Sequence, residues 1–471
     1  MKKEENKMEK IVSLAKRRGF VYPGSEIYGG LANTYDYGPL GVELKNNIKR
    51  AWWKYFIQDR EDMVGIDGGI ISSAKIWEAS GHIKNFRDAM VECKECHFRF
   101  RPDKEIPGFI TEFMMGSGEI GDNPVKHEIT AHVDLLNKFK CPKCNVKGNF
   151  TKPKTFSGLF KTILGPVEED GEVAYLRPET AQNIFVNFKN VLNSNNKKIP
   201  FGIGQIGKAF RNEITTGNFI FRTLEFEQME IEYFIAPDAN WNKIFESWVD
   251  YMHGFGDLIG LNHKHFKDDD IKKDELAFYS KRTIDMEYKF PFSDDYEELW
   301  AIAYRTDYDL TQHQKASNQS MEYFDDIEKK KYIPHVIEPT FGVDRTLLAL
   351  LSEAYHEEGE GDEMRVVLKL KPNMAPYKIA VAPLLGNKEK LADKAREIFV
   401  GLKKKWNCVW DDRGNIGKRY RSQDEIGTPY FIVVDFDSLE DDAVTVRDRD
   451  TTKQERVKIK DLDKYFEEKL N

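Results

Sequence analysis

The sequence has no long apolar run, only five cysteines, and no excess of positive charge. Among its 471 residues, no stretch approaches the roughly 20 apolar residues that a membrane-spanning helix needs. Residues 1–5 have no apolar segment behind their basic side chains, so they do not resemble a secretory signal. These absences argue against membrane and secreted classes, and they predict a cytoplasmic protein without a membrane partner.

Two common catalytic devices are also missing. The sequence contains no Gly-x-x-x-x-Gly-Lys phosphate loop and no recognisable arrangement of a nucleophile beside a base. The chemistry must therefore depend on positioning reactants and stabilising charge. The net charge of −8 argues only weakly against a nucleic-acid partner, because such a partner needs a local basic track and not a basic protein.

The length predicts two to four domains. We predict an N-terminal part of a catalytic domain over 1–90, a cysteine-rich insertion over 91–150, a catalytic core over 151–360 and a separate domain over 370–471. The first part should open with a helix over 8–18 and contain another over about 42–57. In the last part strands and helices alternate, which is typical of an α/β domain. Its strands are predicted at 378–384, 407–410, 430–435 and 443–447, and its helices at 388–404, 420–425 and 460–469.

The segments 210–213 and 221–230 combine arginine, carboxylates and phenylalanine at strand spacing. If they form two antiparallel strands, side chains two residues apart share a face. Arg211 would then lie beside Glu213, and Phe226 beside Gln228 and Glu230. This pattern predicts a nucleotide site in which Arg211 binds an α-phosphate, Glu213 accepts from an adenine amino group and Phe226 stacks on the base. Glu230 would face a substrate ammonium; the alternative is an edge hairpin with a solvated charged face.

A second phosphate site is predicted where 338–345 enters a helix near Gly342. Arg345 would lie in the first turn, where free N–H groups and the helix dipole favour an anion such as a γ-phosphate. Glu298 is a candidate ligand for Mg²⁺ on the phosphates. A surface ion pair for Arg345 and an exposed acid for Glu298 are the alternatives.

The cysteines form two Cys-x-x-Cys pairs, Cys93 with Cys96 and Cys141 with Cys144. In a cytosolic chain this pattern favours a structural Cys₄ zinc site, while metal-free thiols or a redox role remain open. Cys408 is predicted to be a core residue. His82 and His313 stand isolated and are interpreted as hydrogen-bonded structural histidines rather than catalytic bases.

Together these segments resemble the class II aminoacyl-tRNA synthetases, and within them the dimeric glycyl type. Residues 35–53, 210–230 and 342–345 are similar to motifs 1, 2 and 3 of that class. The glycyl type is suggested by 175–182, 298–300 and 304–310, and residues 414–429 resemble the anticodon-binding domain. The resemblance implies an α+β fold, in which an antiparallel sheet flanked by helices carries the site and a C-terminal α/β domain binds tRNA.

The resemblance also implies a reaction, residue roles and partners. The reaction would activate glycine with ATP to glycyl-adenylate and transfer glycyl to the 3′ end of tRNA(Gly), with Mg²⁺ as cofactor and a homodimer as the assembly. Arg211, Arg345 and Glu298 would be catalytic. The implied ATP-binding residues are Arg211, Asn212, Glu213, Phe221, Arg222, Thr223, Leu224, Glu225, Phe226, Glu298, Leu299, Gly342, Val343, Asp344 and Arg345. The implied glycine-binding residues are Arg101, Glu179, Phe226, Glu227, Gln228, Met229, Glu230, Glu338, Pro339, Thr340, Phe341 and Gly342.

Three departures from the family pattern concern fine tuning and remove no charged role. Thr340 stands where Ser is expected, residues 156–160 depart from the expected Phe-Asn-Leu/Met-Met-Phe, and Ala301 replaces an expected Gly. The implied carboxylates Glu179, Glu230 and Glu338 would repel one another without a bound cation, which predicts a raised pKa among them. A synthetase for another small amino acid and a non-catalytic nucleic-acid-binding relative are the two rival interpretations.

Overall fold

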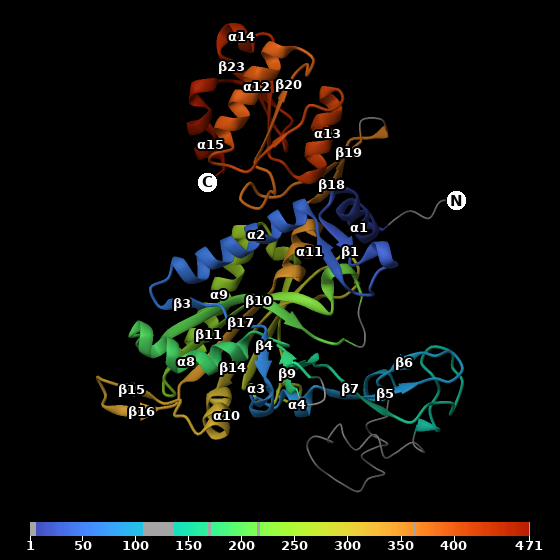
Figure 1. The fold of residues 1–471 in the computed structure, drawn as a ribbon, viewed down its shortest axis with the longest axis vertical. Helices are drawn as coiled ribbons and strands as arrows, with labels where there is room; N and C mark the ends of the chain where they lie inside the picture. The colour runs from blue at the N-terminus through green and yellow to red at the C-terminus, as the bar shows by residue number, and fades with distance from the viewer. Residues whose placement is uncertain (1–5, 107–135, 168–170, 214–216, 362–363, 471) are drawn as a thin grey trace.

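A computed structural model describes residues 6–106, 136–167, 171–213, 217–361 and 364–470 of the chain. Figure 1 shows a central body, a C-terminal body above it, and an extension at the lower right that carries part of the cysteine-rich segment. Helices are mixed with largely antiparallel sheets, which confirms the predicted α+β class. Within the described ranges, no helix is long and apolar enough to cross a membrane.

The central body is built on a seven-stranded sheet. All neighbouring strands pair antiparallel except β10 and β3, which are parallel. In spatial order the strands are β12 (Phe266–Asp270), β13 (Arg282–Tyr288), β14 (Glu297–Thr306), β17 (His335–Gly342), β11 (Glu225–Ile235), β10 (Phe201–Phe210) and β3 (Met63–Ile66).

Strand β11 shows how alternation divides the two faces of this sheet. Met229, Ile231 and Tyr233 are buried in the main hydrophobic core, whereas Gln228 and Glu230 point to the opposite face. The main core is covered by α1 (Lys7–Arg18), α2 (Pro39–Trp53), α9 (Trp241–Ile259) and α11 (Val343–Ala354). The other face carries α8 (Ala181–Asn195) and α10 (Tyr308–Ser317) around a smaller core.

Two helix predictions near the N-terminus need adjustment. Asn6 and Glu9 form a capping box that begins α1 at Lys7, one residue before the predicted start. The second helix begins at Pro39, where the missing N–H of proline costs nothing, and not at 42. It continues beyond Trp53 as a π-helical turn over Lys54–Gln58.

The C-terminal body has the predicted alternation of strands and helices. Its sheet order is β21 (Cys408–Trp410), β20 (Ile379–Pro383), β22 (Tyr430–Val434), β23 (Ala443–Asp448) and β24 (Gln454–Lys458). Strand β20 pairs parallel with β21 and with β22, whereas β23 pairs antiparallel with both β22 and β24. The helices are α12 (Glu389–Leu402), α13 (Ile416–Ile426), the short α14 (Ser438–Asp441) and α15 (Leu462–Leu470). Strand β24 was not predicted, because its mostly exposed sequence has no apolar alternation.

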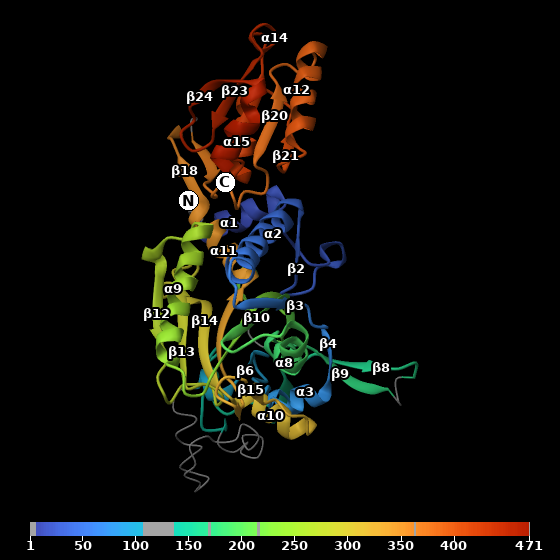
Figure 2. The ribbon, with the colours of Figure 1, turned by 90° about the vertical axis from the view of Figure 1, so that its left-hand side faces the viewer.

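The N-terminal helix joins the two bodies. In Figure 2 it lies at their junction, where Arg17 and Arg18 of α1 form ion pairs with Glu425 of α13. The buried Asp424 beside it accepts from Arg365 and from Arg447. The ion pairs of Arg17 and Arg18 therefore fix α13 against the N-terminal helix, while Arg447 of β23 holds α13 on its own sheet.

Smaller sheets surround these bodies. Two three-stranded sheets consist of β4 (Ile71–Ser73), β9 (Glu172–Leu176) and β8 (Lys161–Leu164), and of β6 (Arg99–Phe100), β5 (Arg87–Glu92) and β7 (Lys154–Ser157). Three hairpins are β1 (Val21–Pro23) with β2 (Tyr35–Tyr37), β15 (Tyr323–Asp325) with β16 (Lys330–Tyr332), and β18 (Tyr355–Glu358) with β19 (Arg365–Leu368). Three short helices, α3 (Ala74–Ala79), α4 (His82–Asn85) and α5 (Pro102–Glu105), lie between β4 and β7 along the chain.

Candidate active site

A cavity of about 550 Å³ opens on the polar face of the main sheet. The residue before the N-cap of α8 and the first turn of α11 both contribute to its wall. Its lining includes these residues of the predicted site: Glu179, Arg211, Glu213, Phe221, Arg222, Thr223, Phe226, Glu227, Gln228, Glu230, Glu298, Leu299, Glu338, Thr340, Gly342, Asp344 and Arg345.

The two arginines that are 134 positions apart line this one cavity. Arg211 donates from Nε to the carbonyl of Pro178 at 2.9 Å, and its guanidinium lies 5.4 Å from the Phe226 ring centroid. Arg345 lies 4.4 Å from the Phe221 ring centroid and donates from Nη1 to the Glu298 carbonyl at 2.8 Å. Aromatic rings and backbone carbonyls therefore hold both cationic groups in place while leaving donors for an anionic ligand.

Strand β10 ends at Phe210, so Arg211 and Glu213 do not lie on a strand as predicted. The ladder with β11 closes at Phe210 and Glu225, and the next three residues form a loop. The backbone N–H of Arg211 still bonds the carbonyl of Leu224 at 3.0 Å. The loop therefore stays close to β11, and Arg211 reaches the same cavity as Phe226.

Three buried carboxylates lie deeper in the cavity, and each has its own hydrogen-bond partners. Arg305 Nη1 donates to both oxygens of Glu338 at 2.8 and 3.0 Å. Glu230 accepts from the hydroxyl of Thr340 at 3.1 Å and from that of Thr180. Gln182 Nε2 donates to Glu179 Oε1 at 3.1 Å. The substituted Thr340 thus keeps the hydroxyl of the expected serine and adds a methyl group beside these acids.

The pKa values of two of these acids are raised, as expected for crowded carboxylates without a bound cation. Burial raises the pKa of Glu338 to about 8, with Arg305 opposing the shift and Glu230 and Glu179 adding to it. Burial and the nearby Glu179 also raise the pKa of Glu230. The sequence-based prediction of a raised pKa in this cluster is confirmed. A ligand ammonium would replace a proton held there.

Two acids near Arg345 suit a divalent cation. Glu298 Oε2 pairs with Arg345 Nη1 at 3.0 Å, and Asp285 on the neighbouring strand also lines the cavity. Burial and then Glu298 raise the pKa of Asp285 to about 7, as expected for carboxylates that crowd one another. Their oxygen donors fit Mg²⁺, which proteins usually bind through one or two carboxylates together with substrate phosphates.

Some residues of the predicted site do not line the cavity. Met229, Phe341 and Val343 are fully buried in the main core on the other face of the sheet. Arg101 directly precedes α5 in the extension and is not part of the lining. The remaining residues outside the lining are Asn212, Leu224, Glu225 and Pro339.

Asp344 and Glu227 line the cavity and also contact side chains of residues 35–53, the segment that resembles motif 1. The ammonium of Lys45 on α2 lies 2.9 Å from Asp344 and 3.2 Å from Glu227. Asp344 also accepts from the Tyr37 hydroxyl and from the backbone N–H of Glu227, the latter at 2.7 Å. These contacts tie α2 and β2 to the first turn of α11, and they fix the position from which Arg345 projects.

Arg305 is the main site residue that sequence reasoning did not assign. It lies on β14 with Ala301 and Ala303, all three lining the cavity at a spacing of two. Besides Glu338 it binds both oxygens of Asp309, and it lies 4.0 Å from the ring centroid of Tyr279. The sequence signal that could have identified it is the strand pattern of small residues at 301 and 303 followed by arginine at 305.

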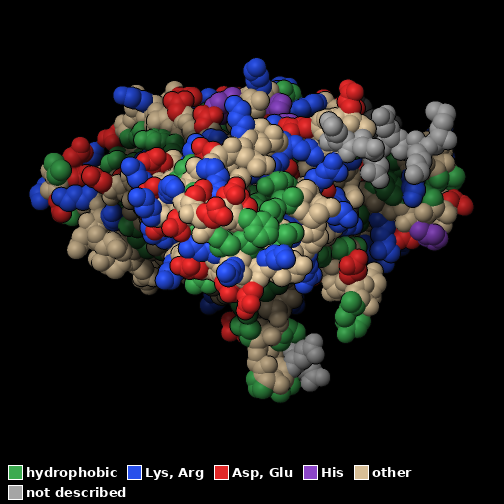
Figure 3. Space-filling view, turned by 90° about the horizontal axis from the view of Figure 1, so that it is seen from above, with side chains coloured by type: hydrophobic (Ala, Val, Ile, Leu, Met, Phe, Trp, Pro, Cys, Tyr) green, Lys and Arg blue, Asp and Glu red, His purple; other side chains and the backbone are tan. Residues whose placement is uncertain are grey.

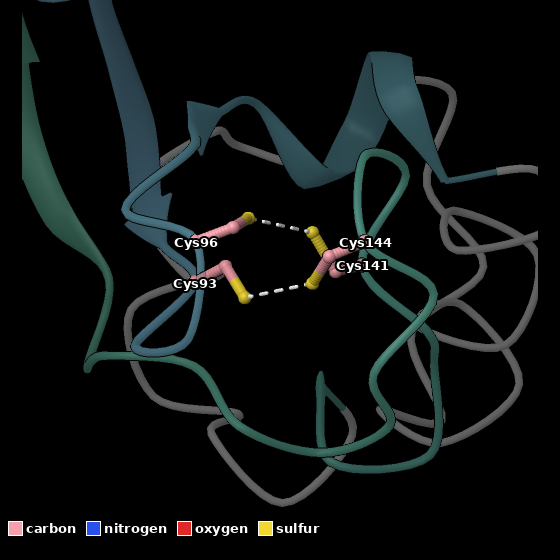
Figure 4. Close-up of side chains that lie close together, drawn as sticks. All are labelled: Cys93, Cys96, Cys141 and Cys144. Carbon is pink, nitrogen blue, oxygen red and sulfur yellow. Dashed lines mark hydrogen bonds between the residues drawn. The ribbon is translucent and has the colours of Figure 1, made fainter.

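The four paired cysteines come together in the extension, as Figure 4 shows. The Sγ atoms of Cys93 and Cys144 are 3.6 Å apart, those of Cys96 and Cys141 are 3.7 Å apart, and all four lie within 4.8 Å of one another. Four sulfurs at Zn–S distances of about 2.3 Å in a tetrahedron are separated by about 3.8 Å, so this donor set fits Zn²⁺. Burial opposes ionisation of Cys93, but backbone N–H groups of Cys96 and Glu95 lower its pKa to about 7. Cys408, in contrast, is buried in the C-terminal core as predicted.

Comparisons with known proteins agree along the whole chain. A profile of the tRNA synthetase class II core domain (G, H, P, S and T) matches residues 160–354, and one of the anticodon binding domain matches residues 378–469. A glycine--tRNA ligase of Lachnospira eligens is 54% identical over 469 residues, covering 99% of each chain. One of Clostridium acetobutylicum is 53% identical, covering 99% of this chain and all of the relative. One of Thermobifida fusca is 49% identical, covering 98% of each.

Proposed function

Because this chain belongs to the glycine--tRNA ligases, a family of class II aminoacyl-tRNA synthetases, we propose that it activates glycine with ATP and transfers the glycyl group to tRNA(Gly). One observation carries the proposal. Arg211, Arg345 and the carboxylates Glu179, Glu230 and Glu338 line one cavity, which therefore offers cations for a triphosphate beside anions for an ammonium.

ATP occupies the outer part of the cavity. Arg211 binds the α-phosphate, and Arg345, in the first turn of α11, binds the γ-phosphate with help from the helix N-terminus. Phe226 stacks on the adenine, and Glu213 accepts from its amino group. Glu298, together with Asp285, would hold the Mg²⁺ that accompanies ATP, and this ion would supply charge neutralisation at the phosphates.

Glycine occupies the inner part, with its ammonium among the three carboxylates. In the first step a glycine carboxylate oxygen attacks the α-phosphorus, and the bond to the β-phosphate oxygen breaks. The products are glycyl-adenylate and pyrophosphate. In the second step the 3′-terminal ribose hydroxyl attacks the glycyl carbonyl, the ester to tRNA forms and AMP leaves. Arg211 stabilises the negative charge that gathers on the α-phosphate, which in comparable sites is worth about 2.7–4 kcal/mol per donor.

Glycine selectivity follows from exclusion. Ala301, Ala303 and Thr340 line the cavity on strands that neighbour those carrying Glu230 and Glu338, and we expect them to exclude larger side chains, while no amino acid is smaller than glycine. A pocket that had to reject a smaller competitor would gain only about 1–3 kcal/mol per methylene.

The test is amino-acid-dependent exchange of labelled pyrophosphate into ATP. We expect exchange with glycine, and little with alanine, serine, threonine or proline. Faster exchange with another amino acid would identify a synthetase for that amino acid, and no exchange with any of them would favour a non-catalytic binding protein. Glycylation of tRNA(Gly) transcripts then tests the transfer step.

The C-terminal body is proposed to bind the tRNA anticodon. A crevice of about 670 Å³ lies beyond the carboxyl ends of the parallel strands β20 and β21, lined by Leu385, Asn387, Asp412 and Asn415. Ligands commonly bind at such carboxyl ends in open α/β sheets. The face seen from above in Figure 3 mixes basic and acidic side chains, so the RNA track must be local.

We also propose a homodimer that uses the segment just before motif 1. Ile27, Tyr28 and Leu31 follow β1 and are 88%, 87% and 59% exposed, which is unusual for apolar side chains so close together. Replacing Ile27 and Tyr28 by serine should lower the mass measured by sedimentation at micromolar concentration. Ile327, 83% exposed between β15 and β16, provides a control substitution that should leave the mass unchanged.

Two further expectations accompany the reaction. We propose that Cys93, Cys96, Cys141 and Cys144 hold a structural Zn²⁺ that fixes the extension beside the central body. We also propose that the reaction takes place in the cytoplasm, which cell fractionation with an antibody against this chain would test.

A further inference from the structure

Two histidines for which the reaction gives no role lie directly behind Glu179. His82 Nε2 is 3.1 Å from Glu179 Oε2, and its Nδ1 is 2.8 Å from the hydroxyl of Ser80. His313 Nε2 is 2.8 Å from Gln182 Oε1. Both histidines are buried, and both reach the same carboxylate, one directly and the other through the Gln182 amide.

The hydrogen-bond directions along this chain are determined by its ends. A carboxylate only accepts, so His82 donates from Nε2 to Glu179. In neutral His82, Nδ1 then accepts the proton of the Ser80 hydroxyl. In the same way, the Gln182 carbonyl oxygen only accepts, so His313 donates to it and the amide nitrogen is turned toward Glu179. Each oxygen of Glu179 therefore receives a donor from behind the cavity.

Packing keeps the His82 ring in this orientation. Its centroid lies 5.3 Å from the ring of Trp77 and 4.8 Å from that of Phe86. Gly81, just before α4, has φ of 81°, a conformation that side chains rarely adopt. The backbone turn at Gly81 therefore favours glycine, and it sets the position of His82 at the start of α4.

Glu179 differs electrostatically from its two neighbours. Burial would raise its pKa, but His82, followed by the Arg305 and Arg211 guanidiniums, holds that pKa below the usual range. The pKa values of Glu230 and Glu338 are raised. Of the three acids, Glu179 is therefore the one whose surroundings favour the ionised form in the free cavity, as a group that attracts an ammonium requires.

We propose that His82, oriented by Ser80, is a positioning residue for glycine recognition: it holds the Glu179 carboxylate charged and aimed at the substrate ammonium. His82 itself does not contact the substrate. The inference deepens the proposed function and rests on it, because it assumes that Glu179 binds the ammonium. It also assigns a role to His82, for which the sequence alone predicts only a hydrogen-bonded structural histidine.

A matched pair of substitutions isolates the hydrogen bond to Glu179. The amide nitrogen of glutamine can reach the place of histidine Nε2, whereas that of asparagine reaches only the place of Nδ1. We expect His82→Gln to keep the glycine KM within about threefold of wild type. His82→Asn should raise it by about tenfold to a hundredfold, the range for a lost hydrogen bond to a charged group, with the KM for ATP unchanged.

The measurement is pyrophosphate exchange, with glycine and ATP varied separately, alongside a thermal unfolding curve for each variant. Ser80→Ala keeps the His82 ring and removes only the hydroxyl that donates to its Nδ1. It therefore provides a milder variant if His82→Asn folds poorly. It should raise the glycine KM by a few-fold and leave the KM for ATP unchanged. His253, whose Nε2 bonds Asp268 at 2.9 Å near the surface, is the control, and His253→Gln should change neither constant.

The results separate the inference from the proposed function. If Glu179→Gln leaves the glycine KM unchanged, the assignment of Glu179 fails and the role of His82 fails with it. If Glu179→Gln raises that KM but His82→Asn and Ser80→Ala do not, only the positioning role is overturned. Equal effects of His82→Asn on glycine and ATP, or no rescue by His82→Gln, would also overturn it.

Discussion

Replacing Arg305 by glutamine should destabilise the central body by about 3–5 kcal/mol, the cost of removing one partner from a buried ion pair. Arg305 donates to Asp309 at 2.8 and 2.9 Å and to Glu338 at 2.8 and 3.0 Å. The exposed fractions of the Arg305 and Asp309 side chains are 3% and 2%. The Asp309 side chain has almost no contact with water, so the substitution leaves its buried carboxylate without a cationic partner.

Protonation of Asp309 in the variant limits the loss of stability and gives a second value for its size. The stranded Asp309 can become neutral, which at pH 7 costs about 4 kcal/mol, at 1.36 kcal/mol for each pH unit above an ordinary pKa near 3.9. At pH 5 the same step costs only about 1.5 kcal/mol. Glu338, with a pKa raised to about 8 chiefly by burial, keeps its proton in wild type at both pH values, and in the variant the loss of Arg305 favours that proton further. Glu338 therefore cancels from the comparison.

The sign of the pH dependence follows from proton counting. Above pH 5 the folded variant holds one more proton on Asp309 than its unfolded chain does, so its stability falls as the pH rises. The deficit of the variant relative to wild type should therefore shrink by about 2.7 kcal/mol between pH 7 and pH 5.

Urea unfolding at pH 5 and pH 7, followed by tryptophan fluorescence, measures both quantities. Arg305→Lys keeps the charge but loses the two-sided fork, so its loss should be intermediate. Lys330→Gln removes an exposed ion pair with Asp238 and should cause no measurable change. A deficit for Arg305→Gln below about 1 kcal/mol at pH 7, or one that does not shrink at pH 5, would refute the reasoning.

Three further predictions concern the cavity and the cysteine cluster. Glu338→Gln and Glu179→Gln should raise the KM for glycine by about tenfold or more while changing that for ATP little, since each removes a charged partner of the ammonium; equal losses in both constants would contradict the role. Glycine binding should strengthen between pH 6 and pH 8, because the pKa of Glu338 is raised to about 8 and the ammonium must displace its proton below that pH. Calorimetry in buffers of different ionisation enthalpy would detect the released proton. Glu338→Gln should flatten the pH dependence. Cys93→Ser and Cys144→Ser should each abolish binding of one Zn²⁺ per chain in native mass spectrometry, whereas Cys408→Ser should not; retention of zinc by both cluster variants would exclude the site.

Local chemistry made much of the site predictable. The helix that begins at Val343 places Arg345 in its first turn, and period-two alternation places Phe226, Gln228 and Glu230 on one face of β11. Both features depend only on neighbours in the chain. The cysteine pairs are likewise recognisable by spacing, and the cluster joins them across a long gap because loop closure costs little more for long loops than for short ones.

Prediction was weaker wherever a position depends on where a strand stops or which register it takes. The ladder between β10 and β11 ends at Phe210, so Arg211 reaches the cavity from a loop and not from a strand. Met229 and Phe341 fall on the core face, although they lie within motifs that resemble glycine-binding segments. No local pattern around Arg211 marks the last paired residue, because the pairing partner lies beyond the intervening loop.

The sequence by itself determined which side chains carry the chemistry: two arginines, a set of carboxylates and four cysteines, each recognisable from the helix start, strand period or pair spacing around it. Only the tertiary structure decided how the carboxylates are paired. Arg305 meets Glu338 because β14 and β17 are neighbours in the sheet, and His82 meets Glu179 because α4 packs behind the start of α8. Hydrogen bonding and ionisation depend on contacts between residues 33 and 97 positions apart, and local sequence patterns do not encode such contacts.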